Sequence, residues 1–159
     1  MLKAFSIVLQ QHPNCLLIIV GDGEQRENIE SQIRDQGIQD KVVLTGYRPK
    51  PHAYLQLMDI LLLSSFSEGT SMTLLEAMGL AKPCVVTDAG GNPEIIEHNV
   101  NGIVTENGNA RAFADGITQI LVDEGKREDM SEASLRRFNK YFKVSQMVDK
   151  YQSIYHQIA

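Results

Sequence analysis

The sequence of 159 residues has no tryptophan, only two cysteines and only 6% aromatic residues. So few cysteines exclude a small secreted domain that is held together by disulfides. Cys15 and Cys84 each lie beside an apolar run, and we expect both to be reduced and buried. Reduced cysteines are typical of a cytoplasmic protein, which is the location that we predict.

Long hydrophobic runs and excess positive charge are also missing. No run approaches the roughly 18 apolar residues of a transmembrane helix, and the first residues do not show a signal-peptide pattern. The chain has 20 acidic and 15 basic residues and a net charge of −5, which disfavours a nucleic-acid partner. The hydrophobic content of 43% suits one globular domain, which we expect to span residues 1–159.

Short apolar runs alternate with helical patterns along the chain. The runs are "CLLIIV" (15–20), "KVVLTG" (41–46), "DILLLSS" (59–65), "PCVVTD" (83–88) and "GIVT" (102–105). They are continuous rather than alternating, which predicts strands that are buried on both faces of a parallel sheet. The patterns between them predict helices over residues 1–11, 24–36, 72–80 and 92–98. The alternation predicts an α/β fold, a Rossmann-like open parallel sheet with helices on both faces.

The chain beyond residue 109 is helical in pattern, over residues 111–123, 126–142 and 144–158. Its aromatic residues recur at helical spacing: Phe138, Tyr141, Phe142, Tyr151 and Tyr155. We therefore expect the helices of residues 109–159 to pack on the sheet. The same region has a basic stretch, Lys126, Arg127, Arg136, Arg137, Lys140 and Lys143. A solvated helix face explains this stretch, and contact with anionic lipid is the alternative.

Ligands of an open α/β sheet bind outside the carboxyl ends of its strands. The loops expected there contain "GDGEQ", "GYRPK", "SEGTSMTLLEAMG" and "TDAGGNPE". Gly21 and Gly23 in the first loop let the backbone approach a ligand closely. Such glycines fit a ligand better than they fit an acidic metal pair, and the four histidines lack the spacing of metal ligands. The sequence therefore predicts no metal site.

Residues 67–79 lead from a loop into a predicted helix, and the first N–H groups of that helix have no intrahelical acceptor. These donors and the positive end of the helix dipole form an anion site that suits phosphate. The side chain of Glu76 leans back toward the helix start, where a carboxylate can accept hydrogen bonds from a vicinal diol. Glu68 offers a second acceptor, so the stretch suits a ligand with sugar, phosphate and ribose. Alternatively, Thr70 or Ser71 only caps the helix and Glu76 is a surface residue.

The stretch "EGTSMTLLEAMG" resembles the E-x7-E motif of the retaining GT-B glycosyltransferases called family 4. The segments "LLIIVGDGEQRENIE", "VVLTGYR" and "PCVVTDAGGNPEIIEHNVNGIV" and the trailing helices also resemble this family, in family order. The resemblance covers nearly the whole chain. It implies the fold of the C-terminal domain of these enzymes, which binds the nucleotide sugar.

The resemblance also implies a role for individual residues. Glu68 corresponds to the catalytic glutamate, which contacts the donor sugar and stabilises charge, and Glu76 to the glutamate that holds the ribose hydroxyls. The remaining residues implied in donor binding are Gly69, Thr70, Ser71, Met72 and Thr73 at sugar and diphosphate, Gly21, Asp22 and Gly23 near the diphosphate, and Tyr47 and Arg48 at the base. The implied transfer retains the anomeric configuration and uses neither a metal nor a cofactor. The resemblance also implies that the leaving phosphate assists the incoming hydroxyl on the same face of the sugar.

The resemblance begins after the family's first strand and the Arg- and Lys-bearing loop that grips the diphosphate. We therefore expect a fragment of a larger enzyme that lacks the N-terminal acceptor domain and is inactive by itself. The missing strand is central in the order 3-2-1-4-5-6, so the other five either close up as 2-1-3-4-5 or leave a gap. An open gap exposes unpaired backbone groups, and we expect a homodimer of the fragment in that case.

The predicted function is transfer of a hexose or N-acetylhexosamine from a nucleotide diphosphate sugar, a UDP-sugar, to a saccharide or lipid-linked acceptor. This reaction would serve the assembly of a surface polysaccharide such as O-antigen, with peripheral contact to the inner face of the membrane. Two alternatives stay open. One is a sugar-nucleotide epimerase of the same architecture, and the other is a non-catalytic flavodoxin-like binding module. A receiver module would need a phosphorylatable Asp where the third run ends in Ser64 and Ser65.

Overall fold

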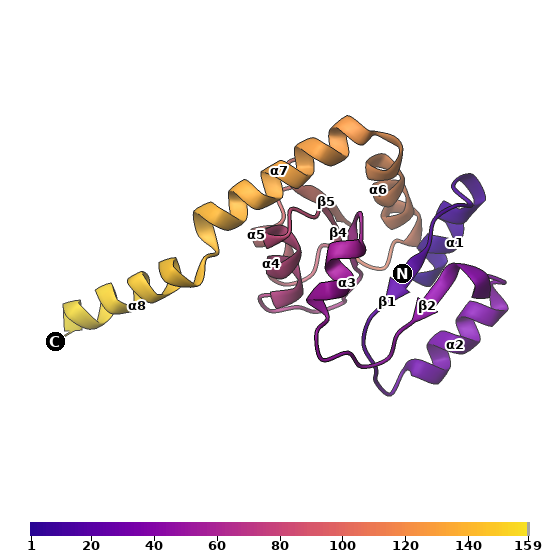
Figure 1. The fold of residues 1–159 in the computed structure, drawn as a ribbon, viewed down its shortest axis with the longest axis horizontal. Coiled ribbons are helices and arrows are strands. Elements are labelled where there is room, and N and C mark those ends of the chain that lie inside the picture. Colours follow the sequence, from indigo (N-terminus) through magenta and orange to yellow (C-terminus); the bar gives the residue numbers. More distant parts are fainter. Residues whose placement is uncertain (159) are drawn as a thin grey trace.

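The computed structural model describes residues 1–158, and the side chains of residues 1–157. In chain order the elements are α1 (Leu2–Gln11), β1 (Leu17–Ile19), α2 (Arg26–Asp35), the 3-10 helix η1 (Gln39–Lys41), β2 (Val42–Leu44), α3 (His52–Leu57), β3 (Leu61–Leu63), α4 (Met72–Gly79), β4 (Cys84–Thr87), α5 (Asn92–Ile95), β5 (Gly102–Thr105), α6 (Ala110–Val122), α7 (Glu124–Tyr141) and α8 (Val144–Ile158) (Figure 1). All the predicted strands form; β5 matches its apolar run, and the other four are shorter than theirs. The predicted α/β class is confirmed.

The strands form two parallel sheets. β1 pairs with β2, and β3, β4 and β5 form a second sheet in that order. Leu62 of β3 packs against hydrophobic clusters of both sheets, so the sheets lie next to each other. Within residues 1–158 no strand ladder joins β1 to β3. Of the two arrangements expected from the sequence, the structure has the one with a gap.

The larger sheet is covered by helices on both faces, and every residue of β4 is buried. Val85 packs into a cluster with residues of α1, β5, α6 and α7, whereas Cys84 and Val86 pack into another with residues of α3, α4 and α5. Successive residues of a strand point to opposite faces, which explains why neighbours in β4 belong to different clusters. The smaller sheet is less enclosed, because Val43 in the middle of β2 is 43% exposed.

The two cysteines are free but differ in burial. Cys84 is completely buried, and this burial raises the pKa of its thiol to about 12. Cys15 lies in the turn before β1 and is only half-buried, so the prediction that both cysteines are buried is wrong for this one. Burial and the charge of Asp59 raise the pKa of the Cys15 thiol, and Lys41 opposes them.

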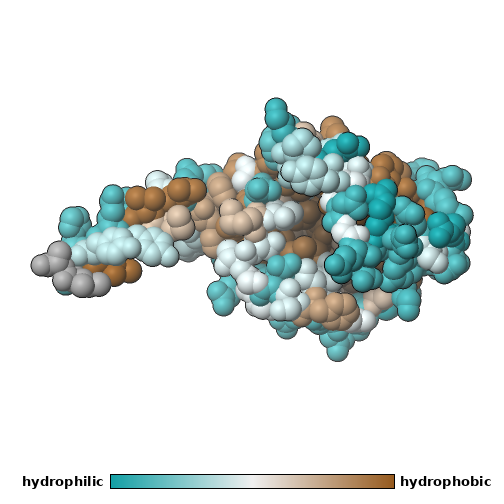
Figure 2. All heavy atoms as spheres, turned by 90° about the horizontal axis from the view of Figure 1, so that it is seen from below, coloured by the Kyte–Doolittle hydropathy of each residue, from teal (hydrophilic) through white to brown (hydrophobic). Residues whose placement is uncertain are grey.

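The C-terminal helices differ in whether they pack on the sheet. α6 and α7 pack on the sheet, and Phe138 of α7 lies against Gly79 at the end of α4. α8 extends away from the rest of the molecule (Figure 1). The expectation that Tyr141, Tyr151 and Tyr155 pack on the sheet is wrong, since they are 49%, 56% and 67% exposed. α8 reaches beyond the edge of the sheet and carries exposed apolar side chains beside hydrophilic ones (Figure 2).

Two elements, the 3-10 helix η1 and the helix α3, were not expected from the sequence. α3 is a six-residue helix that begins after Pro51 and buries the side chain of Leu55. One buried residue in six gives no helical periodicity, so the pattern could not reveal it. No helix within residues 1–158 has both the length and the apolar character required to cross a membrane.

Candidate functional site

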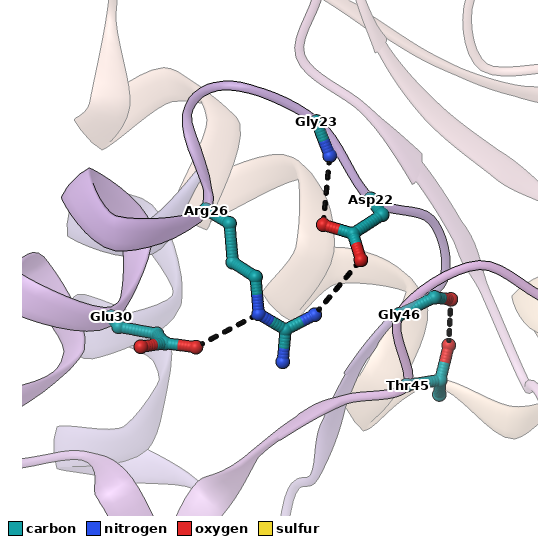
Figure 3. A network of polar contacts seen from close by, with 6 residues as sticks. All are labelled: Asp22, Gly23, Arg26, Glu30, Thr45 and Gly46. Atoms are coloured by element: carbon teal, nitrogen blue, oxygen red, sulfur yellow. Dashed lines mark hydrogen bonds and ion pairs between the residues drawn. The ribbon is translucent and has the colours of Figure 1, made fainter.

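The loops that follow β1 and β2 are joined by their backbones at the carboxyl ends of these strands. The N–H of Gly21 donates to the carbonyl of Gly46 at 3.1 Å. The hydroxyl of Thr45 donates to the same carbonyl at 2.9 Å (Figure 3). Gly21 and Gly46 have φ angles of 131° and 67°, a region that L side chains rarely adopt. These two glycines therefore allow the loops after β1 and β2 to turn sharply and to contact each other.

Asp22 in the first loop is engaged by its neighbours. Its Oδ1 accepts from the N–H of Gly23 at 2.9 Å, and its Oδ2 lies 3.4 Å from the guanidinium of Arg26 (Figure 3). Arg26 also pairs with Glu30 at 3.0 Å. The loop and the start of α2 line a cavity of about 310 Å³. The apolar part of its lining consists of Ile19, Val20, Ile29 and Leu44. This cavity can take a flat or apolar part of a ligand beside exposed backbone.

Tyr47 and Arg48 follow Gly46 and project into solvent. The ring of Tyr47 is 75% exposed, and the side chain of Arg48 is exposed as well. No hydrogen bond or ion pair within the described residues holds the guanidinium of Arg48. Both side chains are available to a ligand at this end of the sheet.

Glu68 follows β3 and is half-buried, unlike its neighbours in the loop. Its Oε1 accepts a hydrogen bond of 2.6 Å from the hydroxyl of Ser65. Such a length is typical of a hydrogen bond from a hydroxyl to a charged carboxylate. The carboxylate is therefore oriented before any ligand arrives.

The start of α4 has exposed donors. Ser71 is the N-cap residue and is buried, but its side chain makes no capping hydrogen bond. Thr70, Met72 and Thr73 are exposed, as is Gly69 before them. The alternative that a hydroxyl caps this helix is wrong, and the first N–H groups of α4 stay open to an anion.

Glu76 lies one turn into α4 and is exposed. Within residues 1–158 its carboxylate takes part in no hydrogen bond and no ion pair. Glu68 and Glu76 thus flank the helix start, one carboxylate held in place and one free to accept hydrogen bonds. Among the described residues there is no group of three or more His, Cys, Asp or Glu side chains that could hold a metal ion.

The predicted site residues lie in the three loops that follow β1, β2 and β3. Residues 21–23 and 47–48 belong to the smaller sheet, and residues 68–76 belong to the larger one. Two residues that the sequence did not reveal, Arg26 and Ser65, contact Asp22 and Glu68 respectively. An arginine four residues after an aspartate is a helical spacing that could have revealed the first contact, whereas nothing distinguishes Ser65 from Ser64 in the sequence.

Parallel strands with helices on both faces, and polar, glycine-rich loops at the carboxyl ends of these strands, are typical of domains that bind nucleotides at that edge of the sheet. The family model described as "Glycosyl transferases group 1" matches residues 1–137, and the chain belongs to this family. The resemblance on which the sequence predictions relied is confirmed.

Curated relatives are larger glycosyltransferases and synthases. The chain is 32% identical over 142 residues to an N-acetyl-alpha-D-glucosaminyl L-malate synthase of Bacillus anthracis, covering 89% of this chain and 37% of that protein. It is 31% identical over 140 residues to a poly(glycerol-phosphate) alpha-glucosyltransferase of Bacillus subtilis, covering 87% and 21% respectively. The chain therefore spans well under half the length of these relatives.

Among solved structures, the Anabaena protein Alr3699/HepE in complex with UDP superposes with a TM-score of 0.85 at 26% identity. The match covers 96% of this chain and 44% of that one. The same protein has also been solved in complex with UDP-glucose. The chain is thus similar to one part of a larger GT-B enzyme.

Proposed function

We propose that the chain is the donor-binding domain of a retaining glycosyltransferase that takes a sugar from a UDP-sugar. The observation that carries this proposal is the pair Glu68 and Glu76 on either side of the uncapped start of α4. Alr3699/HepE, which shares the fold, is known in complex with UDP and with UDP-glucose. The acceptor that we propose is a saccharide or a lipid-linked sugar of a surface polysaccharide.

In the proposed complex the ribose hydroxyls donate to the free carboxylate of Glu76. The diphosphate accepts from the backbone N–H groups at the start of α4, and the sugar hydroxyls donate to Glu68. Glu68 would stabilise the positive charge that develops on the sugar ring, while the leaving phosphate takes the proton of the incoming acceptor hydroxyl. We propose that this transfer needs no metal and no cofactor, and that it retains the anomeric configuration.

A binding measurement on the Glu76→Ala variant tests the ribose assignment. We expect this variant to lose about 1–3 kcal/mol of affinity for UDP, because hydrogen bonds to a charged group contribute on this scale. Glu128, an exposed glutamate of α7 that lies with Asp59 and Lys82 at the opposite, amino ends of β3 and β4, supplies the matched control variant Glu128→Ala. Equal UDP affinity in the Glu76→Ala and Glu128→Ala variants would refute the assignment.

The partner that we propose first is the remainder of a longer enzyme, including its acceptor-binding domain. The gap between β1 and β3 supports this proposal, because a central strand from elsewhere would satisfy the backbone groups at both edges. When the chain is studied alone, we propose that a second copy occupies the gap and makes a homodimer. Sedimentation at high concentration tests the dimer, and a strictly monomeric profile would contradict it.

We also propose that the isolated chain does not turn over its donor, and that the whole enzyme works in the cytoplasm at the inner face of the membrane. The free cysteines suit that compartment. An assay of the isolated chain with UDP-glucose and a lipid-linked acceptor tests the first part, and product formation would contradict it.

A further inference from the structure

The end of β4 reaches across to the loop that contains Glu68. Thr87 is the last residue of β4 and is only 4% exposed. The ladder between β3 and β4 ends where Leu63 pairs with Val86. Beyond this point the hydroxyl of Thr87 donates to the carbonyl of Ser65 at 2.6 Å. A buried side chain thus continues the connection between the two strands past the last backbone pair.

Ser65 passes this restraint on to Glu68. The carbonyl of Ser65 is fixed by Thr87, and the hydroxyl of Ser65 donates to Oε1 of Glu68 at 2.6 Å. Within residues 1–158 no donor bonds to Oε2 of Glu68. One carboxylate oxygen is therefore restrained, while the other keeps its full capacity to accept hydrogen bonds.

The backbone of the same loop is held by close packing against the loop after β4. A Cβ atom built on Gly90 would lie 1.7 Å from the carbonyl oxygen of Glu68. A Cβ atom on Gly91 would lie 2.6 Å from the carbonyl oxygen of Gly69. On another side, the amide of Asn107 donates to the carbonyl of Phe66 at 3.2 Å. Only glycine lets the two loops approach this closely.

We propose that Thr87 and Ser65 are positioning residues, which together set the orientation of the Glu68 carboxylate for the sugar of the donor. This inference rests on the proposed function. It gives Ser65 and Thr87 an indirect role in recognising the sugar. Thr87 fixes the backbone of Ser65, and the Ser65 hydroxyl fixes the rotamer of Glu68. The pre-set rotamer aims Oε2 at the ligand, so that less side-chain freedom is lost on binding. Bare UDP has no sugar and gains nothing from this arrangement.

The test compares the affinities of UDP-glucose and UDP in variants of this chain, measured by calorimetry or NMR titration. We expect Ser65→Ala to reduce the preference for UDP-glucose over UDP about fivefold, and Thr87→Val about twofold, while UDP affinity stays unchanged. Thr105→Val is the matched control. It removes a buried hydroxyl that donates to the carbonyl of Val86 at 3.2 Å and makes no hydrogen bond to Ser65 or Glu68. An unchanged preference in a folded Ser65→Ala variant would overturn the proposal.

A second measurement needs no ligand. Three-bond NMR couplings report the side-chain rotamer of Glu68, and we expect one rotamer in the wild type and averaging in Ser65→Ala. Averaging already in the wild type would overturn the positioning role, even if Thr87→Val fails to fold. If the wild type has one rotamer but binds neither UDP nor UDP-glucose, the proposed function fails while the positioning of Glu68 stands.

Discussion

The two pairs of loops around the candidate site are held in contrasting ways. The loops after β1 and β2 meet through the backbones of Gly21 and Gly46, and Arg26 holds only the first of these loops, by ion pairs that are partly exposed. The loops after β3 and β4 are linked by the buried hydroxyl of Thr87 and by direct backbone packing at Gly90. The difference follows from the sheets, because β4 is completely buried whereas β2 is partly open. One side of the site is thus pre-arranged, and the other can adapt to its ligand.

The largest effect is expected where the two loops of the larger sheet touch. Gly90→Ala puts a methyl group against the carbonyl of Glu68 at a φ of 52°, so we expect a loss of about 3 kcal/mol in the free energy of unfolding. Urea denaturation followed by circular dichroism measures this loss.

Gly37→Ala is the control for backbone strain without a clash. Gly37 has a φ of 66°, and a Cβ atom there would meet nothing within 4 Å. We expect this control to lose about 1 kcal/mol. Equal losses in the Gly37 and Gly90 variants would show that close packing of the two loops is unimportant.

The same substitution in two strands tests the difference between the sheets. Val85→Ala removes two methyl groups from a fully buried position of β4, and we expect it to cost about 2 kcal/mol of stability. Val43→Ala in β2 should cost less than about 1 kcal/mol, since its side chain is 43% exposed. Thermal denaturation of both variants provides the comparison, and similar losses would contradict the unequal burial of the two sheets.

The smallest effect is expected at the ion pairs of the first loop. Arg26→Gln removes contacts to Asp22 and Glu30, and exposed pairs of this kind contribute only about 0–1 kcal/mol. We therefore expect a loss of about 0.5 kcal/mol that fades at high salt. A loss above 2 kcal/mol, or one that salt does not change, would mean that this loop is as firmly held as the loop of Glu68.

Much of the fold could be predicted from the sequence. Each continuous apolar run became a strand, because buried parallel strands need apolar side chains on both faces. The gap between β1 and β3 could be predicted only as one of two arrangements. Which strands pair depends on contacts between segments far apart in the sequence, and a local sequence pattern does not contain this information. The position of α8 was missed because an apolar stripe on a helix predicts a packing face without saying which surface it meets.

The sequence could predict which residues belong to the candidate site, but not the contacts that hold its loops together. A hinge of small residues before a helix pointed to Glu68 and Glu76 but left two interpretations open, and the resemblance to the family decided between them. Contacts of Thr87 and Gly90 with the Glu68 loop join residues about 20 positions apart through the β3–β4 pairing, and only the folded backbone brings them together. The roles of the predicted residues in donor binding stay predictions.

An NMR amide-shift titration of the chain with UDP, with GDP and ADP in parallel, tests most directly whether these loops form one donor site. We predict that UDP shifts the amides of residues 21–23, 47–48 and 68–76 together, with one affinity, and that the shifts are larger than with GDP or ADP. Residues at the opposite ends of the strands, such as Lys82 and Glu128, should not move. Shifts that gather around Lys82 and Glu128, or a folded spectrum that millimolar UDP leaves unchanged, would contradict the proposed donor site.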